Sequence, residues 1–428
     1  MMDNKHSNIP QGYKYSSLGI IPKEWEVKKL GDIFSQLGSF SFSRDQMTIE
    51  QQKLNYIHYG DIHLNKEKDC VDLKKDKLPF IFDGLIKKER LVDSTFPYLK
   101  NGDIILADAS EDYEGIGKSW EIIETNNHKV ISGLHTIPLR SYTNEIAVGF
   151  GRYLFKNTKS AIALKQVAQG TKVYSISYNH ISKLEVLVPP LPEQQKIAEI
   201  LSIWNKAIEQ QSKLIDALIR RKRGLMQQLL TGKKQLKGFN EKWGTVKAGT
   251  IFKNVSINGK NDEQLLSATQ DNGVIPRDML EARVTMPTGE TDSFKLVEQG
   301  DFVISLRSFQ GGIEYSYYRG IVSPAYTVLK PKEKINKEFY KEYFKSGNFI
   351  GHLAVAVIGI RDGKQISYND FCFIKIPYPS IEEQTAIAKI ITAADREIHI
   401  GKQKLTLLDA QKRGLMQELL TGKKRVII

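Results

Sequence analysis

A long internal repeat constrains the fold of this chain more than any other feature. Residues 221–234 (RKRGLMQQLLTGKK) match residues 411–424 (QKRGLMQELLTGKK) at 12 of 14 positions without a gap, at an offset of 190. At the same offset, residues 189–201 (PPLPEQQKIAEIL) align with residues 379–391 (PSIEEQTAIAKII). Repeats of this kind indicate that one structural unit occurs twice, so any single-unit fold is excluded.

The starts of the two halves also match, whereas their middles do not. The matching positions lie at an offset of 218 and pair Trp25, Lys29, Gly31, Ile33 and Phe34 with Trp243, Lys247, Gly249, Ile251 and Phe252. The stretches between these anchors differ in length by 28 residues and share only scattered similarities. Similar ends and divergent middles indicate a common scaffold that holds two modules with different targets.

The repeated segments are predicted to be long helices. Pro192 suits the first turn of one helix, and Ser380 with Glu383 forms an S-x-x-E capping box at the start of the other. Gly232 and Gly422 are placed to end them. Gly224 and Gly414 lie within the helices at a cost of about 1 kcal/mol each relative to Ala. They are expected to mark a close backbone approach or a break.

Apolar residues recur in both helices with heptad spacing, which is typical of a coiled coil. Seven of nine seam positions are apolar in each helix, and the polar interruptions fall at matching positions, Gln211 with Gly401 and Lys222 with Lys412. The alternative is two amphipathic helices, each packed on its own domain. The full seams are Leu201, Trp204, Ile208, Gln211, Ile215, Leu218, Lys222, Leu225 and Leu229, and Ile391, Ala394, Ile398, Gly401, Leu405, Leu408, Lys412, Leu415 and Leu419.

The divergent units are predicted to be mixed α/β modules. Alternating or β-branched runs predict strands, and amphipathic runs predict two short helices at 147–155 and 337–344. The predicted strands are 103–106, 134–139, 184–188, 301–306 and 373–376. The predicted domains are therefore 1–188, a helical region 189–231, a second module 232–378 and a second helical region 379–428.

Composition favours a polyanionic partner and a reducing location. Lys and Arg number 62 against 49 Asp and Glu, which gives a net charge of +13. Basic side chains gain by displacing counterions from phosphates, although membrane-surface and other basic proteins share this balance. Cys70 and Cys372 are too few for a disulfide framework. Without a signal peptide or an apolar span, a cytoplasmic location is expected.

The sequence lacks the usual motifs of catalysis. No G-x-x-x-x-G-K-[ST] phosphate loop, H-E-x-x-H metal motif or dinucleotide fingerprint occurs, so we expect no catalytic residue, metal or cofactor in this chain. His58 and His63 are two of eight scattered histidines, and His135 is interpreted as a packed or capping residue. The carboxylates near Asp108 and Asp112 are interpreted as solvated loop residues.

The chain resembles the specificity subunits of type I restriction-modification systems. The resemblance rests on PPLPEQQKIA with GLMQQLLTGKK, on its recurrence as IEEQTAIAKI with GLMQELLTGKK, and on the segments GIIPKEWEVKKLGDIF and GFNEKWGTVKAGTIF. The family implies two target-recognition domains, related by a pseudo-two-fold repeat and joined by an antiparallel coiled coil, that recognise a bipartite double-stranded DNA site. Two methyltransferase and two restriction-translocation subunits, which use S-adenosylmethionine, ATP and magnesium, are the implied partners.

Loops after the strands offer side chains that suit DNA contacts. Arg and Lys bind guanine edges, Asn and Gln bind adenine, and hydroxyls bind phosphates. The second unit lacks a partner for Lys118, because LRSFQGGIEYS has no matching Gly-Lys. The candidates are Ser41, Ser43, Arg44, Ser110, Lys118, Thr171, Lys172 and Tyr174 in the first unit, and Asn258, Lys260, Arg307, Ser308, Gln310, Arg361 and Lys364 in the second.

Two other functions remain open from the sequence. One is a stand-alone metal-dependent DNA nuclease, which DNA cleavage by the purified chain with magnesium would establish. The other is a coiled-coil assembly scaffold with no nucleic-acid role. Salt-dependent binding to random-sequence duplexes separates the second function from DNA recognition.

Overall fold

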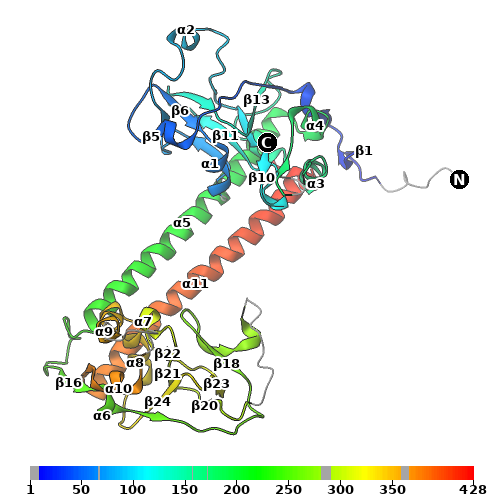
Figure 1. The fold of residues 1–428 in the computed structure, drawn as a ribbon. Coiled ribbons are helices and arrows are strands. Elements are labelled where there is room, and N and C mark those ends of the chain that lie inside the picture. Colours follow the sequence, from blue (N-terminus) through cyan, green and yellow to red (C-terminus); the bar gives the residue numbers. More distant parts are fainter. Residues whose placement is uncertain (1–8, 66–67, 157, 171, 281–290, 358–365) are drawn as a thin grey trace. The chain divides into compact units, whose positions relative to one another are not determined.

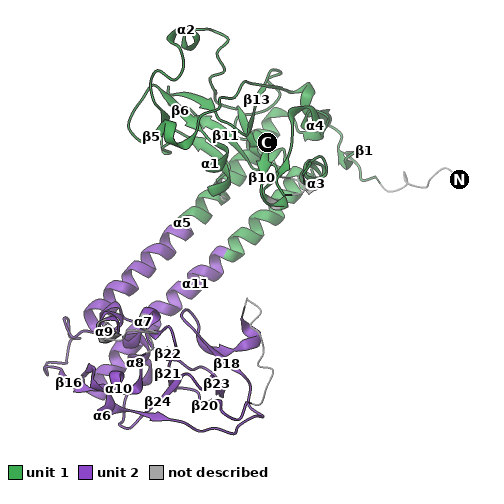
Figure 2. Cartoon of the chain, viewed as in Figure 1, with its two compact units in different colours: residues 1–210, 406–428 green, residues 211–405 purple. Residues whose placement is uncertain are grey.

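The computed structural model describes residues 9–65, 68–156, 158–170, 172–280, 291–357 and 366–428. Contacts divide the chain into two compact units (Figure 2). Unit 1 comprises residues 1–210 and 406–428, and unit 2 comprises residues 211–405. This division splits both long helices, whereas the domain boundaries predicted from the repeat follow their ends.

Unit 1 is a mixed α/β module built around a five-stranded sheet of order β4-β13-β9-β11-β7 and a four-stranded sheet of order β12-β6-β8-β5. Its short helices include α1 (Tyr59–Leu64), α2 (Lys88–Leu91), α3 (Thr158–Gln166) and α4 (Tyr178–Ile181). Its strands are β1 (Tyr13–Ser16), β2 (Gly19–Pro22), β3 (Glu26–Lys29), β4 (Phe34–Gln36), β5 (Met47–Thr48), β6 (Leu54–Ile57), β7 (Cys70–Asp72), β8 (Phe80–Ile81), β9 (Ile104–Ala107), β10 (Ala109–Ser110), β11 (Ser119–Glu124), β12 (Lys129–Ser132), β13 (Thr136–Ser141), β14 (Tyr174–Ser175) and β15 (Glu185–Val188).

Unit 2 is a related module around a four-stranded sheet of order β17-β24-β21-β22. Its short helices include α6 (Ala248–Ile251), α7 (Ser308–Gly311), α8 (Lys337–Phe344), α9 (Gly347–Val357) and α10 (Tyr368–Phe373). Its strands are β16 (Gly244–Lys247), β17 (Phe252–Val255), β18 (Leu266–Thr269), β19 (Gly273–Pro276), β20 (Lys295–Val297), β21 (Phe302–Ile304), β22 (Glu314–Tyr315), β23 (Gly320–Val322), β24 (Thr327–Pro331) and β25 (Lys375–Tyr378).

The two units share the central part of their sheets. The order β4-β13-β9-β11 in unit 1 corresponds to β17-β24-β21-β22 in unit 2. Phe34 and Phe252, which match in the sequence, begin corresponding strands and are fully buried. Each sheet is accompanied by a two-stranded ladder between the start and the end of its module, β3 with β15 and β16 with β25. The prediction of two mixed α/β modules is confirmed.

Most predicted elements occur, with two differences. Strands form near 103–106, 134–139, 184–188 and 301–306, and α8 coincides with the helix predicted at 337–344. The helix predicted at 147–155 is wrong, because only the short 3-10 turn Gly151–Tyr153 forms there. Gly149, at a φ of +95°, precedes this turn, and its left-handed backbone is incompatible with a helix. The last strand starts at Lys375, since α10 occupies the residues before it.

The repeated segments form the long helices α5 (Leu191–Leu229) and α11 (Ile381–Leu420) (Figure 1). Every position of the two predicted seams is buried or half-buried. Gly232 and Gly422 follow the helices at φ values of +68° and +70°, the left-handed conformation that ends a helix. Gly224 and Gly414 interrupt neither helix, and a Cβ built on either would meet no atom within 4 Å. They mark neither a break nor a close approach within the described chain.

Within each unit, the start of one long helix packs against the end of the other. In unit 1, Leu201 of α5 and Leu419 of α11 belong to the same core. In unit 2, Leu229 of α5 shares a core with Ile391 of α11. The two helices therefore run antiparallel, as predicted, and the alternative in which each helix packs only on its own domain is wrong.

The recurrence of tryptophan and glutamate in the repeat has a direct structural reason. Nε1 of Trp25 donates to Oε2 of Glu193 at 2.8 Å, and Nε1 of Trp243 donates to Oε2 of Glu383 at 2.8 Å. Each glutamate lies in the first turn of a long helix. Ser380 accepts a hydrogen bond from the backbone N–H of Glu383, but the Glu383 carboxylate turns to the indole and does not complete the capping box. The repeated residues thus fix each helix start to its module.

Candidate DNA interface

The candidate interface of unit 1 lies where β9 ends. The chain leaves β9 at Ala107 and enters the short strand β10, which pairs with β14 so that Ser110 lies opposite Tyr174. Tyr174 stacks edge-on against Tyr113, with ring centroids 5.5 Å apart. Nζ of Lys165 lies 5.5 Å from the Tyr113 centroid. The loop after β9 thus gathers two aromatic rings and a cation, groups that suit contacts with nucleic acid.

The structure separates the candidates of unit 1 by exposure. Ser41, Ser43, Arg44 and Lys172 are exposed, while Lys118 and Tyr174 are half-buried. Arg44 Nη1 lies 2.8 Å from Oδ1 of Asp61, which fixes the guanidinium at the surface. Ser110 is only 6% exposed, and its Oγ accepts from the backbone N–H of Asp112 at 3.3 Å. The Ser110 hydroxyl therefore serves the turn and is not available at the surface.

Unit 2 presents its candidates in a corresponding loop after β21. Arg307 and Gln310 are both exposed. Arg307 directly precedes the short helix α7, and Gln310 lies within it. Ser308 is 1% exposed, and its Oγ accepts from the backbone N–H of Ser305 at 2.8 Å. Ser308 thus organises the loop that displays Arg307 and is itself unavailable to a ligand. Asn258 and Lys260 are exposed in the loop after β17.

Three candidates lie outside the described residues. They are Thr171 of unit 1 and Arg361 and Lys364 of unit 2.

Sequence analysis missed a cluster of histidines beside the β9 loop, which we call the histidine cluster: His58, Tyr59, His63, Asp108 and His135. The Tyr59 ring lies 4.6 Å from the His58 ring, 6.1 Å from the His63 ring and 5.4 Å from the His135 ring, between centroids. His58 caps the start of α1, where its Nδ1 accepts a hydrogen bond from the backbone N–H of Gly60 at 3.0 Å. Burial lowers the pKa of His58.

His135 is not buried and caps no helix of the described chain, contrary to the interpretation from sequence. Its side chain is 50% exposed, and its backbone has a φ of +56°, in the left-handed region that few non-glycine residues adopt. Nδ1 of His135 lies 3.3 Å from Oδ1 of Asp108. That carboxylate is half-buried, and burial raises the pKa of Asp108. The only sequence signal for the cluster was the proximity of His58 and His63, because the fold alone brings His135 to them.

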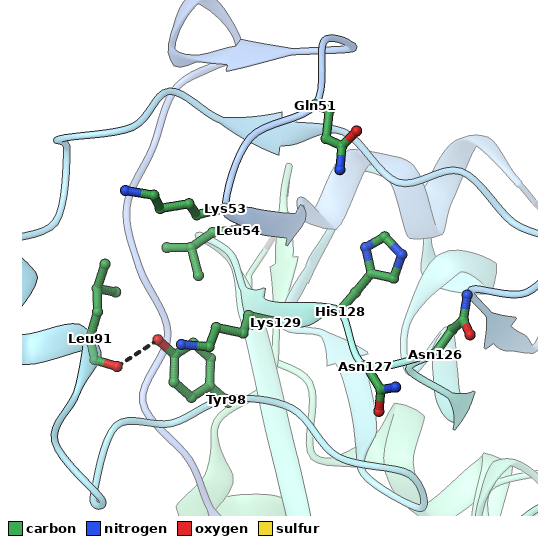
Figure 3. Close-up of a pocket in the computed structure, with 9 residues that line it drawn as sticks. All are labelled: Gln51, Lys53, Leu54, Leu91, Tyr98, Asn126, Asn127, His128 and Lys129. Atoms are coloured by element: carbon green, nitrogen blue, oxygen red, sulfur yellow. Dashed lines mark hydrogen bonds between the residues drawn. The ribbon is translucent and has the colours of Figure 1, made fainter.

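A cavity of about 400 Å³ lies at the opposite end of the strands that lead into the histidine cluster (Figure 3). β6 and β12 run parallel, with Leu54 opposite Lys129 at their start and Ile57 opposite Ser132 at their end. Leu54 and Lys129 line the cavity, and Lys129 lies over the Tyr98 ring at 5.1 Å from its centroid. The same strand pair thus has a cationic cavity at one end and the histidine cluster at the other.

Neither a metal site nor a membrane span is found in the described part of the chain. Within the described ranges, no group of three or more histidine, cysteine or acidic side chains is arranged to bind a metal ion. Among the same residues, no helix combines the length and the apolar character needed to cross a bilayer. Cys70 and Cys372 are free and partly buried.

Comparison with known proteins identifies the family. The model for the type I restriction modification DNA specificity domain matches residues 22–218 and again residues 235–410. A Methanocaldococcus jannaschii protein, provisionally named as the specificity subunit of the type I restriction enzyme MjaX, is 28% identical over 97% of this chain and 97% of its own length. The MjaVIII specificity subunit of the same organism is 25% identical over 95% of this chain and 94% of its own.

Solved structures show the same fold. A crystal structure of a type I restriction-modification S subunit from M. genitalium matches with a TM-score of 0.52 at 16% identity, over 92% of this chain and 96% of that one. A chain solved in work on the assembly and conformational transition of the type I restriction-modification system matches with a TM-score of 0.59 at 14% identity, over 94% and 99%. The two family matches together cover most of both halves, so this chain belongs to the type I restriction-modification specificity subunits.

Proposed function

We propose that each unit of this chain recognises one half of a bipartite DNA site, and that the chain itself catalyses no reaction. The observation that carries the proposal is the contrast between the shared scaffold and the divergent loops. The order of the four shared strands and the hydrogen bond from tryptophan Nε1 to glutamate Oε2 are the same in both units. The loops after β9 and β21 display different side chains, with Ala109 in one unit at the place of Arg307 in the other.

The proposed partners follow from the family. Methyltransferase and restriction-translocation subunits, two of each, would supply the chemistry with S-adenosylmethionine, ATP and magnesium. The chain would supply the base contacts and the surfaces on which those subunits assemble. Its excess of basic residues supports a polyanionic ligand, since Lys and Arg near phosphates release counterions.

An exchange of modules tests the proposal. Residues 30–180 are replaced by the corresponding segment of another family member, which leaves the β3–β15 ladder and both long helices in place. The chimera is expressed with the methyltransferase subunits, and the methylated sequence is determined by sequencing. We expect one half of the site to change and the other half to stay the same.

The matched exchange in unit 2 uses residues 248–374 and leaves the β16–β25 ladder in place. It is expected to change the opposite half of the site. A change in both halves from either exchange would refute independent recognition. Methylation of no defined sequence by the natural chain would refute the role in specificity, and DNA cleavage by the purified chain with magnesium would refute the non-catalytic role.

A further inference from the structure

His135 is the exposed histidine of the cluster, and one of its ring nitrogens forms no hydrogen bond within the described chain. His58 Nδ1 accepts from a backbone N–H, and His63 Nε2 lies 2.8 Å from the carbonyl oxygen of Ala109. His135 directs Nδ1 towards Asp108, while its Nε2 forms no hydrogen bond with any described residue. Since the His135 side chain is half exposed, this nitrogen can meet a ligand.

The surroundings of His135 fix the direction of its ring. The backbone N–H of Asp108 donates to the carbonyl oxygen of His135 at 3.1 Å, which joins the end of β9 to the start of β13. Tyr59 packs edge-on against the imidazole. Oδ1 of Asp108 is buried and forms no hydrogen bond of good geometry within the described chain, so it favours a proton on the facing Nδ1.

The backbone of His135 is held in a sparsely populated conformation. A φ of +56° on a residue with a ring side chain costs free energy, and such conformations persist where the surrounding structure imposes them, often at functional sites. Here the conformation places His135 beside the β9 loop and against Tyr59 of α1. The candidate residue Arg44 is joined to the same helix, α1, through Asp61.

We propose that His135 determines part of the DNA specificity of unit 1, with Nε2 accepting a hydrogen bond from the amino group of an adenine or a cytosine. Asp108 is the positioning residue that directs the ring. Adenine N6 and cytosine N4 are the amino donors that face the major groove, and an imidazole with its proton on Nδ1 accepts at Nε2. The inference rests on the proposed function, because it names the base contact of that same interface.

The test uses the full-length chain with its methyltransferase subunits and a plasmid library that carries randomised sequence. Methylated sites are sequenced for the natural chain and for His135→Asn. Asparagine tolerates the left-handed backbone but is too short to replace Nε2. We expect one position in the half-site assigned to unit 1 to lose its preference for adenine or cytosine by about tenfold. The half-site of unit 2 should keep all its preferences.

His128→Asn is the matched control. His128 lies at the cavity end of β12, and its Nδ1 lies 3.0 Å from Oδ1 of Asn55. The substitution is expected to leave the methylated sequence unchanged. Hydrogen exchange of unit 1 peptides confirms that both variants fold.

Asp108→Asn tests the positioning role through the base preference itself. The carboxylate can only accept a hydrogen bond from Nδ1 of His135, whereas the Nδ2 amide of asparagine can donate to Nδ1 and so favours the proton on Nε2. Nε2 then no longer accepts from an amino group. We expect the variant to lose the preference for adenine or cytosine at the same position as His135→Asn, with the other positions of the half-site unchanged.

Three results would overturn the assignment of His135. They are an unchanged methylated sequence in the His135→Asn variant, an equal loss at every position of the half-site in a folded variant, and an Asp108→Asn variant that keeps the full preference for an amino base at that position. None of these results touches the proposed function, as long as the complex with the natural chain methylates a defined bipartite sequence. Failure of the natural chain to do so refutes the proposed function itself.

Discussion

The junction between module and long helices differs between the two units, although the repeat supplies both. In unit 2, Nζ of Lys222 lies 2.7 Å from Asp395 on α11 and 2.9 Å from Glu342 on α8. At the offset of 190, Lys222 corresponds to Lys412 and Asp395 corresponds to Asn205. The helix pair of unit 1 therefore retains the cation but has an amide in place of the carboxylate.

Unit 1 obtains the missing negative charge from its divergent module. Oδ1 of Asp69 lies 3.0 Å from Nη1 of Arg152, and Oδ2 lies 2.9 Å from Nζ of Lys156. Oδ2 also lies 3.5 Å from Nδ2 of Asn205 on α5, and Lys412 contributes to the low pKa of Asp69. The repeat thus preserves the packing of the two long helices. The acidic residues that balance the charge of each junction come partly from the divergent module. We expect the charge balance of the unit 1 junction to depend on Asp69 alone. In unit 2, Asp395 and Glu342 share the neutralisation of Lys222.

The largest effect is expected from Asp69→Ala. The Arg152 and Asp69 side chains are 6% and 7% exposed, so the substitution removes the carboxylate that pairs with a buried cation. Unit 1 should lose about 3–5 kcal/mol of stability. Hydrogen exchange of unit 1 peptides measures the loss, because a two-unit chain need not unfold in one step.

Glu342→Ala in unit 2 is the matched substitution. Lys222 keeps Asp395 as a partner, so we expect a loss of only about 1 kcal/mol. Equal losses from the two substitutions would contradict the comparison.

The next effect concerns pH and a buried glutamate of unit 1. Burial raises the pKa of Glu121 from 4.5 to about 7, against the lowering effect of the backbone N–H groups of Gly149 and Arg152. The folded unit therefore binds this proton more tightly than the unfolded chain does. The protonated carboxyl contributes at most about 3 kcal/mol to the free energy of unfolding. This contribution is complete below about pH 4.5 and disappears as the pH rises through 7.

Glu121→Gln should flatten the pH dependence of hydrogen exchange in unit 1 without changing that of unit 2. Glu314 provides the control, because burial likewise raises its pKa to about 7 while Lys345 opposes the shift. Glu314→Gln should alter the pH dependence of unit 2 alone. An effect of Glu121→Gln on both units would contradict their independence.

A smaller effect is expected where the tryptophan–glutamate contacts differ. Arg425 donates to both oxygens of Glu193 at 2.7 and 3.0 Å, whereas Oε1 of Glu383 is buried without a hydrogen-bond partner in the described chain. Gln235 stands at the position of unit 2 that corresponds to Arg425. Arg425→Gln should therefore destabilise unit 1 by about 1–2 kcal/mol, as measured by urea denaturation with hydrogen exchange.

The reciprocal substitution sharpens that comparison. Gln235→Arg should stabilise unit 2 by up to about 1 kcal/mol, if the guanidinium reaches Glu383 as Arg425 reaches Glu193. A loss of stability in unit 2 would show that Glu383 is satisfied in another way.

The smallest effect concerns the helix glycines. Gly224 and Gly414 face open space, so their substitution by Ala should stabilise the chain by about 0.5–1 kcal/mol each. Gly401 differs, because a Cβ there would meet Cγ1 of Ile215 at 3.2 Å and Nε2 of Gln211 at 3.4 Å. Gly401→Ala should therefore give no gain in melting temperature, and a gain equal to that of Gly224→Ala would contradict the tight contact.

Sequence analysis could predict the scaffold because its signals are periodic and occur twice. Heptad spacing predicted that Leu201, Ile215 and Leu229 face a partner helix, and the repeat showed which partner. Gln211 and Gly401, predicted to match, are in contact, since Nε2 of Gln211 donates to the carbonyl oxygen of Gly401 at 3.1 Å. Lys222 and Lys412 do not meet each other, because an antiparallel pair carries them to different units.

The candidate interface was less accessible to prediction because it depends on contacts between distant segments. The prediction treated Ser110 and Ser308 as loop hydroxyls, and only the turn geometry shows that both are buried. His135 looked like a core residue from its apolar neighbours. Its exposure follows from a left-handed backbone that composition does not reveal. For the exposed candidates, such as Arg307, a contact with DNA stays a prediction.

The discontinuity of unit 1 affects the order in which the chain matures during synthesis. Leu419, Leu420 and Arg425 complete its core and its glutamate contact, yet they follow all of unit 2 in the chain and leave the ribosome after it. Unit 2 lies within one continuous stretch, residues 211–405, and is available for folding earlier. The module translated first is therefore finished last. A transcript that stops shortly after residue 405 would yield a complete second module beside an open first one.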